Sequence, residues 1–384
     1  MKILFLTYHG FDPASGISKK MLAQIKGLRE NGHEVHVCSY DRNAEGHLCR
    51  FVDDRAIQNY GTGVRAALRQ RAGYGCIYDY CVKAGIELVY ARSYMNATPP
   101  LVSFFRRLKK AGVRSVMEIP TYPYDQEFDG YDWNQRMRLR VDKLFRRQLA
   151  AQMEAIVTFS DEEQIFGQRT IRISNGVDLD AIPLLTTRHD TSQQIHIIAV
   201  AEVHSWHGFD RFIHGLGEYY RKHEGESRRD VFFHIVGKVW PSEMEGSDVA
   251  PGYAPYIREY GIERYVKFHD KLFGEALDEV FNHCSFAVGS LARHRSGITV
   301  IKTLKNREYA CRGIPFIYSE QDSDFDHQPY ILKAPADESP IDIDAVLHFI
   351  DHFNISPQDI RRTVEHLSWK NQMEKVVEEL GTRS

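Results

Sequence analysis

Basic side chains, a glycine and a carboxylate follow one another between residues 293 and 308. A short apolar run, Phe286–Val288, precedes a basic loop at 293–297, and helical spacing of apolar residues then leads to Glu308. Lys305 lies just before that carboxylate. A carboxylate can accept two hydrogen bonds from a vicinal diol such as a ribose, while cations and the amides of a helix start suit a diphosphate. These residue types are the ones that a nucleotide-sugar site needs.

The elements that would position this stretch alternate as in a parallel sheet. Gly313 is expected to end the helix, Pro315 prevents its continuation, and Phe316–Tyr318 is the next predicted strand. Ligands of an open parallel sheet bind beyond the carboxyl ends of its strands. We therefore expect the 293–297 loop and the first helical turns, with Val300 and Ile301 on the buried face, to border a ligand.

The same alternation fills the chain in two blocks. The first block opens with a strand at 2–8, a glycine-containing loop and a helix at 19–31, whereas residues 42–80 are less regular. After a polar stretch at 186–194, the pattern restarts with a strand at 195–200. We expect an α/β fold of two Rossmann-like domains facing a cleft. The expected parts are a first domain at 1–185, a second at 186–367, and a helix at 368–384 that packs back on the first.

Composition restricts the classes of function. The formal net charge of -3 argues against a strongly basic nucleic-acid binder. The six cysteines form no C-x-x-C pattern, which indicates a reducing compartment and no structural zinc site. The apolar run of the first ten residues is too short for a signal peptide, and no run approaches the ~20 apolar residues of a membrane span. We therefore expect a cytoplasmic protein.

The order of several motifs resembles glycosyltransferase family 4, a family of retaining enzymes with the GT-B fold that includes the capsule and surface-polysaccharide type of glycosyl transferase group 1. The nucleotide-binding helix of that family carries a lysine, a glutamate three residues later and then Gly-x-Pro, as Lys305, Glu308 and Gly313-Ile314-Pro315 do here. SNGVD at 174–178 resembles its interdomain junction, and WHGFDR at 206–211 resembles a helix start of its second domain. The similarity covers nearly the whole chain.

The resemblance implies transfer of a hexose from a nucleoside-diphosphate sugar to a polysaccharide or lipid-linked saccharide, without a metal or cofactor. It implies that Glu308 holds the ribose. The Arg and Lys with which the family binds the diphosphate correspond to Glu202 and His207, and neither offers a secure positive charge at pH 7. By this correspondence His207 joins Arg293 and Arg295 as a candidate catalytic residue. Glu202 joins Lys305 and the backbone near Gly297 and Gly16 as a candidate for binding the donor.

Polar and aromatic residues at strand ends of the first block are candidates for the acceptor, since a carboxylate between aromatic faces suits a sugar. An ordinary loop at the edge of the sheet is the alternative. The acceptor candidates are His9, Arg92, Glu118, Tyr122 and Tyr124.

Several alternatives stay open at this point. Glu308 could instead form an ion pair with Arg312 one turn later. The basic helix predicted at 133–153 could be a solvated face, or it could dock peripherally on the inner face of an anionic membrane. For the whole protein, the alternatives are a GT-B nucleotide-sugar epimerase and a non-catalytic member that binds glycans or partners.

Overall fold

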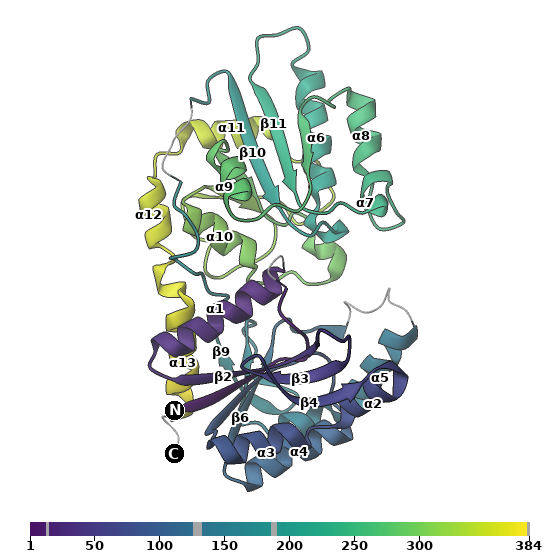
Figure 1. Cartoon of the computed structure of the whole chain (residues 1–384). Coiled ribbons are helices and arrows are strands. Elements are labelled where there is room, and N and C mark those ends of the chain that lie inside the picture. The colour runs from purple at the N-terminus through teal and green to yellow at the C-terminus, as the bar shows by residue number, and fades with distance from the viewer. Residues whose placement is uncertain (13–14, 126–132, 186–189, 382–384) are drawn as a thin grey trace. The chain divides into compact units, whose positions relative to one another are not determined.

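The structure is a computed structural model that describes residues 1–12, 15–125, 133–185 and 190–381 (Figure 1). The chain forms two compact units. Unit 1 comprises Met1–Ser174 and Trp369–Ser384, and unit 2 comprises Asn175–Ser368.

The units divide before residues 175–185, whereas the sequence pattern placed the boundary after them. Hydrogen bonds hold this segment in unit 2, because the Val177 N–H donates to the Leu367 carbonyl at 3.0 Å and the Leu185 N–H donates to the Arg312 carbonyl at 2.9 Å. Part of the predicted linker, 186–189, lies outside the described residues.

Unit 1 is built on a sheet that has nine strands within the described residues, in the order β4-β3-β2-β1-β5-β6-β7-β9-β8. The strands from β2 to β9 in this order are parallel, and the outer strands at both edges are antiparallel. The strands are β1 (Lys2–Leu6), β2 (Glu34–Arg42), β3 (Leu48–Val52), β4 (Arg55–Gly61), β5 (Leu88–Arg92), β6 (Arg114–Ile119), β7 (Ala155–Thr158), β8 (Gln164–Ile165) and β9 (Gln168–Arg172).

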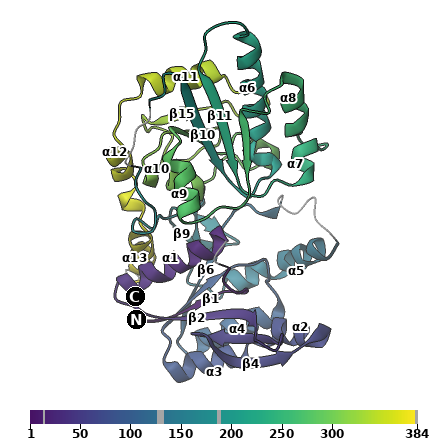
Figure 2. The same cartoon turned by 45° about the horizontal axis from the view of Figure 1, so that its top comes forward.

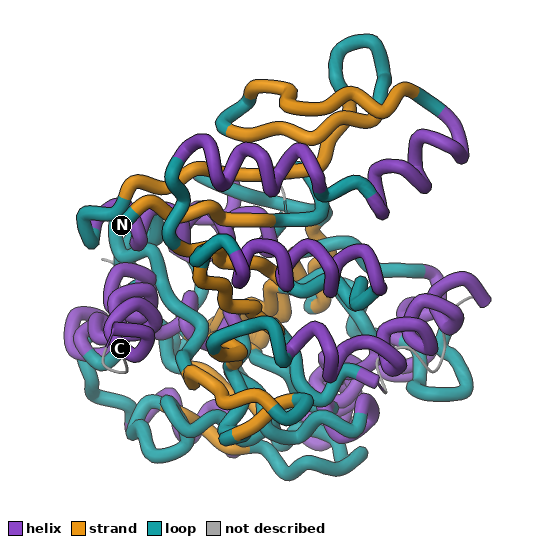
Figure 3. The backbone as a smooth tube through the Cα atoms, turned by 90° about the horizontal axis from the view of Figure 1, so that it is seen from below, coloured by secondary structure: helices purple, strands orange, loops and turns teal. Residues whose placement is uncertain are grey.

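Helices flank the strands of unit 1, and the view in Figure 3 separates the two kinds of element by colour. The helices are α1 (Gly16–Glu30), α2 (Gly63–Ala72), α3 (Gly75–Ala84), α4 (Pro99–Lys110), α5 (Trp133–Ala150) and α13 (Trp369–Gly381).

The period-2 pattern of β1 explains why both faces of this sheet are covered. Ile3 and Phe5 point to one face and join a core with α1 and α13. Leu4 and Leu6 point to the other face and join a core with α4 and α5. All four side chains are fully buried, as expected for a central strand of a parallel sheet.

The stretch 42–80, which the sequence pattern described as less regular, is ordered. It contains the hairpin β3–β4 and the helices α2 and α3. Asp53 and Asp54 connect the two strands with positive φ values of 49° and 65°, the pattern of a type I′ turn. The sequence pattern of this hairpin is weak because β4 is an edge strand whose residues are mostly exposed.

Unit 2 is built on a sheet with six described strands, all parallel, in the order β12-β11-β10-β13-β14-β15. Figure 2 gives a second view of this sheet and its helices. The strands are β10 (Gln194–Val200), β11 (Asp230–Val236), β12 (Val266–His269), β13 (Phe286–Val288), β14 (Phe316–Tyr318) and β15 (Ile331–Lys333).

The helical segments of unit 2 include three short 3-10 turns, written η. In chain order, the helical segments are η2 (Ser205–His207), α6 (Phe209–Lys222), α7 (Pro241–Glu245), α8 (Tyr253–Tyr260), α9 (Glu275–Asn282), η3 (Arg293–Ser296), α10 (Leu304–Arg312), α11 (Ile343–His352), α12 (Pro357–Arg362) and η4 (Glu365–Leu367).

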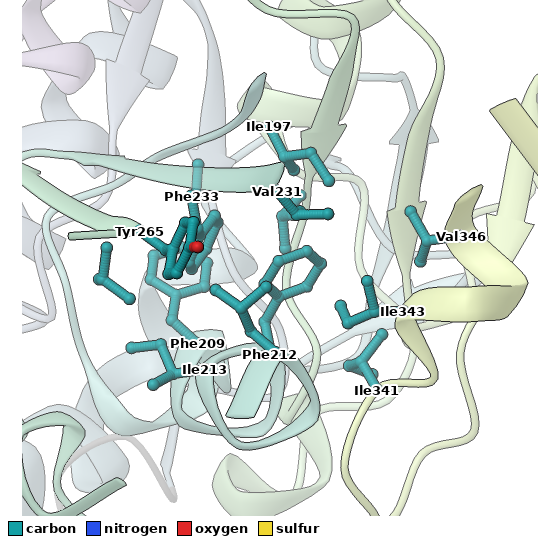
Figure 4. Packing of buried hydrophobic residues seen from close by; sticks show 14 of the residues in the cluster. Ile197, Phe209, Phe212, Ile213, Val231, Phe233, Tyr265, Ile341, Ile343 and Val346 are labelled. Atoms are coloured by element: carbon teal, nitrogen blue, oxygen red, sulfur yellow. The ribbon is translucent and has the colours of Figure 1, made fainter. Parts of the chain in front are cut away.

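One face of the unit 2 sheet packs against α6 and α11. Phe209 and Phe212 of α6 lie against Phe233 of β11, with ring centroids 6.0 and 4.4 Å apart (Figure 4). Ile343 and Val346 of α11 belong to the same core. This core fixes the start of α6, and with it the segment that connects β10 to α6.

The helix that carries Glu308 begins later than predicted. Val300 and Ile301 are outside it, since the Ile301 N–H donates to the Gln321 carbonyl at 3.0 Å and α10 begins at Leu304. The predicted strands on either side, 286–288 and 316–318, have the predicted bounds. Glu308 therefore lies on the second turn of a short helix.

Candidate functional site in unit 2

The strand order of unit 2 changes direction at β10, which pairs with β11 on one side and with β13 on the other. In doubly wound sheets, the crevice beyond the carboxyl ends of two such strands is where ligands bind. Here η2 follows β10 and η3 follows β13. On topological grounds, these two segments therefore build the candidate ligand site of this unit.

A glycine lets η2 and η3 approach each other closely. Gly208, directly after η2, has a φ of +63°, and a Cβ atom there would lie 2.8 Å from the Ala292 nitrogen. The Leu291 N–H donates to the His207 carbonyl at 2.9 Å. Any side chain at 208 would combine an unfavourable backbone conformation with a collision.

His207 is a buried neutral imidazole. The backbone N–H of His204 donates to its Nδ1 at 3.0 Å, so the ring hydrogen of the neutral form is on Nε2. Burial holds the pKa of His207 well below the usual value, and the charges of Lys305 and Arg293 add to the effect. At this position the chain provides a hydrogen-bond donor and no positive charge.

Lys305 and Arg293 provide positive charge beside His207. The Lys305 ammonium is buried and has no hydrogen-bond partner among the described residues. Burial lowers the pKa of Lys305, and the nearby Arg293 guanidinium lowers it further. Arg293 also lies 5.8 Å from the centroid of the Trp206 ring. Two like charges close together in a buried region favour the approach of an anion.

Glu320 is a member of this cluster that the sequence pattern did not single out. Its side chain is buried at the carboxyl end of β14, and Asn306 Nδ2 donates to its Oε1 at 3.4 Å. Within the described part of the chain, its Oε2 has no hydrogen-bond partner. Burial raises the pKa of Glu320. Its position two residues after a predicted parallel strand was the available signal.

Glu308 lies on α10 and is one-third exposed, at 31%. Arg312 donates to its Oε1 from Nε and Nη2, both at 3.0 Å, and also donates to Asp278 at 2.7 Å. The ion pair with Arg312 that was the alternative interpretation is therefore present. Both bonds use Oε1, so Oε2 remains able to accept a hydrogen bond from a ligand hydroxyl.

Arg295 is occupied by internal ion pairs, which differs from its predicted contact with a phosphate. It donates to Asp210 at 2.9 and 2.7 Å and also pairs with Glu338, and its side chain is only 4% exposed. Because these carboxylates saturate the guanidinium, Arg295 holds η3 in place. Gly297 ends that turn with a φ of +67°.

The remaining donor candidates lie on exposed backbone. Glu202 is exposed in the loop after β10. Gly16 is the first residue of α1 in unit 1, and a Cβ atom there would meet nothing within 4 Å. Packing does not require the residue type found at either position. The predicted roles of Glu202 and Gly16 in binding the donor remain predictions.

Candidate acceptor residues in unit 1

Glu118 is fully buried, which differs from its predicted contact with an acceptor. Its Oε2 accepts hydrogen bonds from Tyr90 and Gln24 at 2.6 Å each, and Lys20 and Arg92 lie 3.3 and 3.7 Å from its Oε1. Burial alone would raise the pKa of Glu118, but Lys20 and Arg92 hold it below the usual value. A carboxylate with no exposed atom acts as an internal anchor of β6.

The aromatic and histidine candidates for the acceptor have different surroundings. The Tyr124 hydroxyl donates to Asp142 at 2.6 Å and its side chain is buried, so it anchors the loop after β6 to α5. Tyr122 packs edge-to-face on Phe166 with centroids 5.7 Å apart. His9, beyond β1, is half-buried and its ring lies 6.2 Å from the Tyr94 ring. Of the predicted acceptor residues, His9 is thus the one beside exposed aromatic surface.

Comparison with known structures

The fold of the chain matches that of GT-B glycosyltransferases over its whole length. Neither a protein-family model nor a curated protein sequence matches the chain. Among solved structures, HepE from Anabaena, in complex with UDP-glucose, is 15% identical with a TM-score of 0.61, and the match covers 100% of both chains.

Two further solved structures match equally well. The catalytic domain of starch synthase IV from Arabidopsis thaliana, bound to ADP and acarbose, is 13% identical with a TM-score of 0.61, and the match covers 100% of this chain and 98% of that one. Trehalose-6-phosphate synthase OtsA is 11% identical with a TM-score of 0.61, and the match covers 100% of this chain and 99% of that one. At such identities the likeness is one of fold, and the predicted α/β class with two Rossmann-like domains is confirmed.

Proposed function

We propose that this chain is a glycosyltransferase that moves a hexose from a nucleoside-diphosphate sugar to a polysaccharide or lipid-linked saccharide, with retention of configuration. The retaining chemistry and the membership of family 4 rest on the motif resemblance. The match in fold to structures that hold UDP-glucose and ADP supports a nucleotide-sugar donor.

The observation that carries the proposal is the buried positive charge at the switch point of the unit 2 sheet. Lys305 keeps an ammonium out of water without a hydrogen-bond partner in the described residues, next to Arg293. Burying an unpaired cation is unfavourable unless an anion compensates it. Glu320 lies in the same cluster and gives Lys305 part of a counter-charge, and a diphosphate bound there would add to it.

Transfer needs stabilisation of the negative charge that develops on the leaving diphosphate. Lys305 and Arg293 are the cations of this site, and the neutral His207 can add a hydrogen bond from its Nε2. Glu308 Oε2 can accept a hydrogen bond from a ribose hydroxyl. In this assignment Arg295 is a positioning residue, because Asp210 and Glu338 hold it.

Replacing Glu308 tests the donor site. Since a hydrogen bond to a charged group contributes ~1.5–3 kcal/mol, Glu308→Ala should weaken binding of a nucleoside diphosphate roughly ten- to a hundredfold. Isothermal titration calorimetry with UDP, ADP and GDP measures this loss. Unchanged affinity would exclude Glu308 from the donor site.

Two matched variants separate a lost ribose contact from a disturbed helix. Asp278→Ala removes the other carboxylate that pairs with Arg312 and leaves Glu308 in place. Glu279→Ala removes an exposed charge from the same helix, α9. Both variants should bind the nucleotide as the unmodified chain does.

A non-catalytic nucleotide-sugar or glycan-binding protein is the second candidate. It is favoured by one observation, namely that Glu202 and the neutral His207 stand where family 4 has an Arg and a Lys. Incubation with radiolabelled nucleotide sugars decides, since turnover with or without an acceptor excludes a purely binding role. A change of the sugar itself without an acceptor would indicate an epimerase.

Peripheral contact with the inner face of a membrane, from a location in the cytoplasm, is part of the same proposal. Within the described residues, no helix combines the length and the apolar character needed to cross a bilayer. Helix α5 exposes Trp133 and Leu144, at 71% and 70%, among arginines. Such a helix suits an anionic surface. Absence of co-sedimentation with anionic vesicles at low salt would refute the contact.

A further inference from the structure

A pocket of about 740 Å³ lies entirely within unit 1, and none of the roles proposed above involves it. The strand order of this sheet changes direction at β1, which pairs with β2 on one side and β5 on the other. Tyr8 follows β1, Tyr40 is on β2, and Tyr94 follows β5, and all three line the pocket. The pocket thus occupies the place where a doubly wound sheet binds ligands, and its volume is within the ~300–1,000 Å³ of small-molecule sites.

The wall of the pocket is rich in tyrosine. Tyr74 from the start of α3 joins the three tyrosines at the strand ends, and the rings of Tyr8 and Tyr40 have centroids 5.9 Å apart. Burial raises the pKa of Tyr8 well above its usual value and that of Tyr74 to about 12, so both hydroxyls keep their protons. Flat apolar faces edged by hydroxyl groups match the alternation of C–H and O–H groups on a sugar.

Positive charge surrounds these tyrosines. Arg71 of α2 and Arg138 of α5 line the pocket and are exposed, and none of its described lining residues is acidic. Arginine binds carboxylates and phosphates through two parallel hydrogen bonds. The lining alone therefore favours a ligand that combines a sugar surface with an oxyanion.

A third arginine lies behind the tyrosine wall. Arg50 is fully buried, with its guanidinium carbon 3.3 Å from the centroid of the Tyr40 ring and 5.6 Å from that of Tyr74. It donates to the Tyr40 hydroxyl and to the Gln70 carbonyl, but its Nε and Nη1 have no hydrogen-bond partner in the described chain. None of its three nitrogens therefore contacts a carboxylate of the described residues.

An arginine stays charged at any pH that the folded chain tolerates, so Arg50 is a permanent cation without a counter-ion among the described residues. Retaining such a charge in a core is costly. An anion in the adjacent pocket would offset part of that cost through the polarisable tyrosine rings and hydroxyls.

We propose that this pocket binds the acceptor of the transfer reaction, and that this acceptor is an acidic saccharide, a sugar bearing a carboxylate or a phosphate group. That the ligand of this pocket is the acceptor of a transfer reaction rests on the proposed function. The preference for a charged sugar rests on Arg50, Arg71 and Arg138 alone. Tyr8, Tyr40, Tyr74 and Tyr94 would contact the sugar ring, and the exposed arginines would bind the oxyanion.

Matched pairs of ligands test the preference on the full chain without any donor. The first pair is para-nitrophenyl glucuronide and para-nitrophenyl glucoside, which differ in one carboxylate, and the second is glucose-1-phosphate and glucose. Calorimetry or ligand-observed NMR should show at least one anionic member binding about tenfold tighter or more than its neutral counterpart. The pair with the larger ratio identifies the anionic group. Equal affinities within both pairs, or no binding by either, would overturn the proposal.

Charge removal at the rim locates the binding. The double variant Arg71→Ala/Arg138→Ala should reduce the ratio within each pair to about threefold or less. The control Arg69→Ala/Arg106→Ala removes two exposed charges from α2 and α4, outside the pocket lining, and should keep the full ratio. A ratio that the rim variant leaves unchanged would overturn the assignment.

The buried arginine has its own pair of variants. Arg50→Lys keeps the charge and should keep most of the preference, whereas Arg50→Met should lose it. If Arg50→Met does not fold, the double variant Arg71→Ala/Arg138→Ala still tests the proposal.

Nucleotide binding separates this inference from the proposed function. If acidic sugars bind as described but no nucleoside diphosphate binds, the pocket stands and glycosyl transfer fails. If nucleoside diphosphates bind and the charged and neutral sugars bind alike, glycosyl transfer stands and the inference fails. Displacement of the acidic sugar by UDP would mean that it occupies the unit 2 site, and would also refute the inference.

Discussion

Burial shifts the pKa values of two individual side chains in the candidate donor site of unit 2. Lys305 has a buried ammonium whose pKa is lowered, and Glu320 has a buried carboxyl whose pKa is raised. Both shifts leave the cluster less charged than the same groups in water. An arriving diphosphate reverses the effect on Lys305, because a nearby negative charge raises the pKa of each group.

Binding of a nucleoside diphosphate should therefore be accompanied by proton uptake. At pH 8, a part of the Lys305 population that is neutral in the free protein becomes protonated in the complex, since the folded pKa lies below the ordinary lysine value and the ligand raises it. Calorimetry in two buffers of different ionisation enthalpy that contain no phosphate, HEPES and Tris, measures the number of protons taken up.

Substitutions identify the side chains that take up the protons when the nucleotide binds. Lys305→Met should abolish most of the uptake, and Glu320→Gln should remove the remainder. His207→Asn should change it little, because the pKa of His207 lies far below this pH range. Identical heats in the two buffers would contradict the assignment of Lys305 to the diphosphate.

Among the elements of unit 2, the close approach of η2 and η3 sets the geometry of the candidate donor site. Gly208 has a left-handed backbone, and a side chain there would collide with the backbone of Ala292. Gly225, in the loop after α6, has a similar φ of +77°, but a Cβ atom there would meet nothing within 4 Å. The two glycines therefore separate the conformational penalty from the collision.

Gly208→Ala should lower the stability of unit 2 by more than the ~1–2 kcal/mol that a left-handed alanine costs, and should also weaken nucleotide binding. Gly225→Ala should show the conformational cost alone, with nucleotide binding unchanged. Thermal unfolding and calorimetry give both quantities. Equal effects of the two substitutions would show that the contact between η2 and η3 is unimportant.

At the scale of the whole molecule, the end of the chain completes the unit in which the chain begins. Helix α13 packs on α1, where a Cβ atom on Gly27 would lie 2.6 Å from the Trp369 carbonyl oxygen. Trp369, Met373 and Val376 of α13 are buried in the same core as Met21 and Ile25 of α1. Unit 1 is thus closed by a segment that is distant in sequence.

Met373→Ala should destabilise unit 1 by ~2–5 kcal/mol, the usual cost of emptying a buried methionine site. Hydrogen exchange should show lost protection in α1 and β1 with little change in unit 2. Glu374→Ala, at the exposed neighbouring position of α13, should leave both units unaffected. Loss of protection that is equal in the two units would contradict the division of the chain.

Much of the regular structure could be predicted from local sequence patterns. Short apolar runs with β-branched and aromatic residues next to turn residues, such as 286–288 and 316–318, favour buried strands. Gly313 and Pro315 fix the end of α10 from local chemistry. The sequence also placed Lys305 and Glu308 on one helix beside a strand end, since that follows from spacing along the chain. The edge hairpin at 48–61 was not predicted from the sequence, because exposed strands lack the apolar alternation on which strand predictions depend.

Which charged residues remain available to a ligand became evident from the packing of the folded chain. Arg295 and Glu118 have the residue types of a binding site, but Asp210 and Lys20, distant in sequence, occupy them with internal ion pairs. Arg50 drew no particular expectation, yet packing buries it beside a pocket, without a counter-ion in the described part of the chain. The physical reason is that burial and charge pairing depend on neighbours in space, which residue types and spacing do not specify.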